Sequence, residues 1–162
     1  MADPPPSVLG SRSDPSPEYE QVLVFYRWLN RELAVDMGPG SFIGSSICDH
    51  QRVLEFANFY FMHGHLHPYF RGELAELVWD SIDEAFSRRQ PTNKEIEAVK
   101  RVVMDAVSND YFIGEKFILH LARCGALHEH AMSSWLLSLD GVDVKRIEEE
   151  TARGRRERGE PM

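Results

Sequence analysis

The chain has 162 residues, of which 43% are apolar and 27% charged, and this composition is typical of one globular domain with its own core. Its formal net charge of −8 argues against nucleic acid as the main ligand, because an acidic surface repels phosphate backbones. Apolar runs such as 22–26 are far shorter than the roughly 20 residues of a membrane span, and the first residues do not resemble an export signal. We therefore expect a soluble, cytoplasmic protein with two reduced cysteines.

Both ends of the chain have the composition of disordered segments. Residues 1–16 are rich in proline, serine and aspartate, and residues 152–162 combine glycine and proline with four arginines. Neither segment has enough apolar side chains to offset the loss of chain entropy on folding. The sequence therefore predicts a disordered N-terminal arm, a helical domain over 17–151 and a disordered basic tail.

The first half of the domain predicts three helices. Ser16 and Pro17 are typical of a helix start, and Gly38-Pro39 ends the helical pattern that follows. Pro68 suits the first turn of another helix, and Gln90-Pro91 ends it. The expected helices cover about 17–37, 49–62 and 68–89. Their inward faces are expected to carry Leu29 and Leu33, then Val53, Ala57, Tyr60 and Phe61, then Leu74, Leu77, Val78, Ile82 and Ala85.

The second half predicts four more helices. Thr92 and Glu95 form a capping box, and Val99 and Val103 follow at helical spacing. The remaining helices are expected over about 110–124, 127–139 and 143–151. The predicted fold class is therefore all-α, an irregular single-domain bundle of about six to seven helices.

Three histidines at alternate positions raise the question of a metal site. His63, His65 and His67 would point to one side of an extended chain, and three imidazoles with an open fourth position form a catalytic zinc pattern. The glycine at position 64 and Pro68 instead favour a polar turn in which one histidine caps the third helix. The sequence therefore favours no metal and no cofactor. A metal-dependent hydrolase built on these histidines is the alternative.

No other motif points to catalysis. The loop over 38–44 lacks the Gly-Lys-Ser/Thr sequence of a phosphate-binding loop. Cys124 follows His120 by one helical turn, but it shares an apolar stripe with Phe117 and Leu121. A catalytic thiolate needs an exposed, electropositive setting, so we expect Cys124 to be a buried structural residue. An enzymatic role is therefore not favoured.

The third predicted helix carries the strongest sign of a binding surface. Residues 56–70 contain more aromatic side chains than a single helix can turn toward the core. Core packing is expected for most of them, and an exposed aromatic patch is the alternative. An apolar anchor beside an acidic rim is the usual anatomy of an electrostatically steered interface. The candidate partner-binding residues are Phe70, Glu73, Glu76, Asp80, Asp83 and Glu84.

These features predict a protein–protein interaction module that binds a basic protein, with neither nucleic acid nor a membrane as partner. One concrete version is a small acidic inhibitor or immunity-type protein that neutralises a basic toxin domain. That version depends only on a general analogy of size and charge. Solubility alone would also explain an excess of acidic residues, and a small-ligand regulator stays open without a motif to support it.

Overall fold

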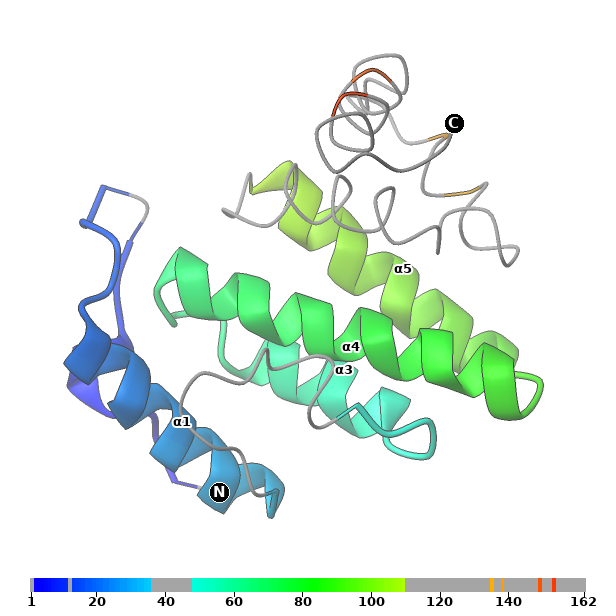
Figure 1. The fold of residues 1–162 in the computed structure, drawn as a ribbon, viewed down its shortest axis with the longest axis horizontal. Coiled ribbons are helices and arrows are strands. Elements are labelled where there is room, and N and C mark those ends of the chain that lie inside the picture. The colour runs from blue at the N-terminus through cyan, green and yellow to red at the C-terminus, as the bar shows by residue number, and fades with distance from the viewer. Residues whose placement is uncertain are drawn as a thin grey trace. The chain divides into compact units, whose positions relative to one another are not determined.

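The computed structural model describes residues 2–11, 13–35 and 48–109, together with positions 135, 138, 149 and 153 (Figure 1). The chain divides into two compact units, Met1–Ile113 and Gly114–Met162, and all the helices described below belong to the first. Within the described residues the elements are the 3₁₀ helix η1 and four α-helices. Their bounds are Pro6–Val8 for η1, Tyr19–Leu33 for α1, Val53–Met62 for α3, Pro68–Arg88 for α4 and Asn93–Ser108 for α5.

The predicted all-α class is confirmed for the part of the chain that the structure describes. This part contains no strand, and an isolated bridge between Leu9 and Leu66 is its only β-type pairing. It contains four α-helices where the sequence predicts six to seven for the whole chain. The helices expected over 110–151, the loop over 38–47 and the tail over 152–162 lie outside the described residues, apart from the four single positions given above.

The helix α1 begins and ends at other residues than the sequence indicates. Its N-cap is Glu18, whose backbone N–H donates to the side chain of Gln21 at 2.8 Å, so this pair replaces Ser16 and Pro17 as the start. Its C-cap is Ala34, which takes the left-handed backbone conformation with φ of 50°. That conformation stops a helix in the way a glycine usually does. The helix therefore ends before Gly38.

The helix α4 is buried over most of its circumference. It packs against α3 and α5, which also pack against each other (Figure 1). It meets α1 through Phe70, whose ring stacks on Phe25 with centroids 4.3 Å apart. The inward residues predicted for this helix are confirmed as buried: Leu74, Leu77, Val78, Ile82 and Ala85.

The helix α3 is shorter than predicted, and the prediction is wrong for one of the residues expected to face inward. It begins at Val53, after a turn in which Arg52 N–H donates to the Asp49 carbonyl at 3.0 Å and Asp49 N–H donates to Ser81 Oγ on α4 at 3.1 Å. Phe61, predicted to face inward, is 39% exposed. Core packing is confirmed for the other aromatic residues of this helix, Phe56, Phe59 and Tyr60.

Residues 2–11 lie against the helices, although their composition predicts a disordered arm. Val8 is fully buried, and its carbonyl accepts a hydrogen bond from the His67 N–H at 2.9 Å. Gly10 approaches the same histidine so closely that a Cβ there would lie 2.7 Å from its Cδ2 atom. One buried valine and a few backbone hydrogen bonds hold this segment against the helices. The overall amino-acid composition of the segment does not reveal contacts made by so few residues.

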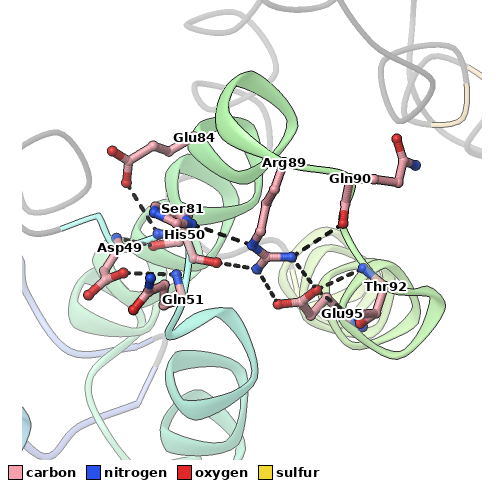
Figure 2. A network of polar contacts seen from close by, with 9 residues as sticks. All are labelled: Asp49, His50, Gln51, Ser81, Glu84, Arg89, Gln90, Thr92 and Glu95. Atoms are coloured by element: carbon pink, nitrogen blue, oxygen red, sulfur yellow. Dashed lines mark hydrogen bonds and ion pairs between the residues drawn. The ribbon is translucent and has the colours of Figure 1, made fainter.

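Arg89 fastens the start of α5 to the segment before α3 (Figure 2). Its guanidinium donates two hydrogen bonds to the Glu95 carboxylate, at 2.5 Å and 2.9 Å, and another to the backbone carbonyl of His50. The Thr92 N–H donates to the same carboxylate at 2.8 Å, which confirms the predicted capping box. The hydrogen bonds from Arg89 are the main cause that lowers the pKa of Glu95 to about 2.

Leu29 tests the core. Its side chain is fully buried on α1, so we expect Leu29→Ala to lower the free energy of unfolding by about 2–5 kcal/mol. Leu54 on α3 is the matched control, since it is 39% exposed and its truncation should cost less than about 1 kcal/mol. Urea denaturation measures both. Equal losses at the two leucines would contradict the described packing.

Glu95 tests the Arg89 clamp. Removing a carboxylate from a buried ion pair leaves the charge of its partner uncompensated. Arg89 is 30% exposed, so water compensates part of its charge, and we expect Glu95→Ala to lower the free energy of unfolding by about 2–4 kcal/mol. Glu97→Ala is the control, because its pair with Lys100 is exposed and contributes less than about 1 kcal/mol.

The Glu95 contribution also has a definite pH dependence. Because its pKa is depressed in the folded protein, the stabilisation is present above the ordinary value of 4.5 and is lost as the pH falls toward about 2. Unfolding measured at neutral and acidic pH should show the gap between wild type and Glu95→Ala closing in acid. A gap that stayed constant would contradict the pairing.

Candidate functional site

The five carboxylates singled out in the sequence share one face of α4. At 100° per residue they lie within one sector of the helix, and Tyr69 precedes them in the same sector. All five are half-buried, and most of the other residues of α4 are buried. The sector is called the acidic stripe below. Its members are Glu73, Glu76, Asp80, Asp83 and Glu84.

The C-terminal end of the acidic stripe is built into the structure. Glu84 pairs with Arg88 at 2.7 Å and accepts the backbone N–H of His50 at 3.2 Å, as Figure 2 shows for His50. Asp80 and Asp83 interact with further groups as well. Glu84 therefore already has stabilising contacts, and neither Asp80 nor Asp83 is without an interaction partner.

The N-terminal end of the acidic stripe differs in this respect. Among the residues that the structure describes, Glu73 and Glu76 take part in no ion pair or hydrogen bond through their side chains. Burial raises the pKa of Glu73 to about 7, and the nearby charge of Glu76 adds to this effect. Burial also raises the pKa of Glu76. Near neutral pH the two carboxyls thus hold a charge that the protein stabilises poorly.

Two tyrosines border this pair of carboxyls. Tyr26 comes from α1 and is nearly buried, and Tyr69 precedes Glu73 by one helical turn on α4. Burial and the negative charges of Glu73 and Glu76 raise the pKa of both hydroxyls, that of Tyr26 to about 12. These four residues, the Glu73–Glu76 cluster, thus combine carboxylates with aromatic rings. Such a setting attracts a cation, since both groups interact favourably with positive charge.

Phe70 does not belong to this surface, contrary to the prediction. Its side chain is fully buried and stacks on Phe25 in the core. The aromatic residue that borders the carboxylates is its neighbour Tyr69. Helical spacing contained the signal, because at about 100° per residue Tyr69 falls among the carboxylates of the stripe, whereas Phe70 lies about 60° to the other side of Glu73 and outside their sector.

The three alternating histidines do not converge. His67 is the N-cap of α4 and its Nδ1 accepts the Tyr69 N–H at 3.1 Å, which confirms the predicted capping role. The His63 ring lies between aromatic side chains, 4.9 Å from Trp28 and 4.4 Å from Phe59 between centroids. His65 is exposed. Within residues 2–11, 13–35 and 48–109, no group of three or more His, Cys, Asp or Glu is arranged to hold a metal ion.

Cys48, close to the C-terminal end of the acidic stripe, has the properties of an inert thiol. It forms no disulfide, is half-buried, and has its pKa raised to about 11 by burial and by the charges of Glu84, Asp80 and Asp49. A thiol held protonated is a poor nucleophile. The other candidate nucleophile, Cys124 with His120, lies outside the described residues.

Neither a membrane-spanning helix nor a known relative gives a further guide to function. In the described part of the chain, no helix has the length and apolar character needed to cross a bilayer. No protein-family model matches the chain, and no curated protein or solved structure shows detectable similarity to it. The chemistry of the acidic stripe is therefore the main guide to function.

Proposed function

We propose that this protein is an interaction module that binds a basic protein through the N-terminal end of the acidic stripe. The observation that carries the proposal is the state of Glu73 and Glu76, two half-buried carboxyls with no ion pair among the described residues. An ionised carboxylate removed from water is costly unless a positive charge compensates it. A lysine or arginine from a partner would supply that charge, so binding relieves a cost that exists in the free protein.

The chemistry of the Glu73–Glu76 cluster favours a side chain over a metal ion. Hard divalent cations take six or more oxygen ligands, and the cluster offers two carboxylates and two phenols that stay protonated. A lysine or arginine needs only one or two carboxylates, and its stem or guanidinium packs favourably on aromatic rings. The half-buried Tyr69 provides such a ring.

The net charge of −8 supports the same kind of partner at longer range. An acidic protein attracts a basic one before contact and so raises the association rate. A small cytoplasmic inhibitor or immunity-type protein that neutralises a basic protein is the specific form that we propose. Size and charge support this form, and the analogy remains general.

Binding should depend on pH through Glu73. A cationic partner favours the ionised carboxylate, so at low pH a proton must leave before the partner binds. With the pKa of Glu73 at about 7 in the free protein, we expect the affinity to rise about tenfold between pH 6 and pH 8. The Glu73→Gln variant should bind about tenfold or more weakly at pH 8 and lose this dependence.

The partner is first captured from the host. Its association and dissociation rates are then measured on the immobilised protein. Glu97→Gln on α5 is the matched control, because its carboxylate is exposed and lies off the stripe; it should bind as wild type does. The association rate should also fall as the salt concentration rises, because the Debye length of about 8 Å at physiological ionic strength already screens long-range attraction between the partners. An acidic partner, a salt-independent rate, or a Glu73→Gln variant that binds like wild type would contradict the proposal.

A further inference from the structure

His63 is a buried imidazole without a polar partner. It lies in the turn between α3 and α4, and the residue is only 6% exposed. Neither Nδ1 nor Nε2 has a hydrogen-bond partner among the described residues. The ring stands at 90° to that of Trp28 from α1 and lies against Phe59 from α3. A neutral imidazole carries one donor and one acceptor, and both are unsatisfied in this position.

The turn that contains His63 is also the place where the N-terminal segment docks. The His67 N–H donates to the Val8 carbonyl at 2.9 Å, and the Gly10 N–H donates to the His65 carbonyl at 3.4 Å. Trp28, whose ring contacts His63, donates from Nε1 to the Ala2 carbonyl at 3.4 Å. His63 therefore lies at the joint that α1 and residues 2–11 form with the 63–67 turn.

The charged groups that face His63 have opposing effects on its pKa, so burial is the main influence on that pKa. Glu32 on α1 and Asp3 in the N-terminal segment favour a proton on the ring, whereas His65 in the turn and Arg71 on α4 oppose one. From α3 the ring meets only the aromatic side chain of Phe59 among the described residues. Burial is the largest effect, and it holds the pKa of His63 below its ordinary value of 6.5.

We propose that His63 is an acid-sensitive latch, whose protonation releases α1 and residues 2–11 from the 63–67 turn. An imidazolium has two donors and a charge that require water or acceptors. Its aromatic surroundings supply neither, and both become accessible once the joint opens. Acid thus favours an open form in which Trp28 and Phe59 are uncovered. This inference is independent of the proposed partner binding.

The expected pH dependence follows from proton linkage. The open form binds a proton near the ordinary pKa of 6.5, and the closed form does so only at lower pH. The equilibrium constant for opening therefore rises as the pH falls, by up to about tenfold between about pH 7.5 and pH 5.5. Glu73 and Glu76 act with the opposite sign, because their raised pKa values favour the folded form on protonation. Comparison with His63 variants removes their contribution.

Hydrogen exchange on the full chain tests the latch at individual amides. The reporters are the amides of Gly10 and His67, which close the joint, and amides of α5 serve as the reference for global unfolding. Rates are divided by the intrinsic exchange rate at each pH. The chains compared are wild type, His63→Phe, His63→Leu and the control Glu97→Gln on α5, whose carboxylate is exposed and lies away from the joint. The leucine variant provides the comparison if phenylalanine does not fit the site.

Relative to the His63 variants, we expect the protection of both reporters in wild type to fall by up to about tenfold from about pH 7.5 to pH 5.5, and to recover on return. The Glu97→Gln chain should behave as wild type does, and the two His63 variants should show no such fall. The inference is overturned if wild-type protection does not fall relative to the His63 variants, or if the α5 amides lose protection to the same extent as the reporters.

Discussion

The burial of α4 is the constraint on which the rest of the described structure depends. The helices α3 and α5 pack on it, α1 stacks on it through Phe25 and Phe70, and one sector of the helix remains half-buried. Charged side chains on α4 can therefore lie only in that sector or be compensated inside. The acidic stripe is the result, since a helix with three enclosed sides concentrates its carboxylates on the fourth.

Buried charge is compensated at some places in this structure and left uncompensated at others. The Arg71 guanidinium lies over the Tyr60 ring at 3.7 Å and pairs with Asp105 at 2.6 Å, and Arg89 pairs with Glu95 in the same manner. Glu73 and His63 have no such partners among the described residues. Compensated pairs stabilise the fold, whereas an uncompensated group changes its protonation or takes a partner from outside. Both functional inferences concern groups of the second kind.

Local signals in the sequence predicted local structure well. The capping box of Thr92 and Glu95, the His67 cap and the buried face of α4 depend on residues within a few positions of each other, and the structure confirms them. The contacts of Val8 with the 63–67 turn, and of Arg89 with His50, join residues far apart in the chain, which spacing does not reveal. Phe70 was misplaced for a different reason, because a cluster of aromatics does not indicate which ring faces inward.

The most direct test of the central claim is the pKa of the Glu73 carboxyl, measured by NMR from the pH dependence of its side-chain carbon shift. The acidic stripe attracts a cation only if this carboxyl is desolvated and lacks a positive partner. We expect a midpoint near 7 in the free protein, shifted toward the ordinary 4.5 when a lysine-rich peptide occupies the stripe. A midpoint at 4.5 in the free protein would contradict the account, because an ordinary solvated carboxylate has no unmet need for a basic partner.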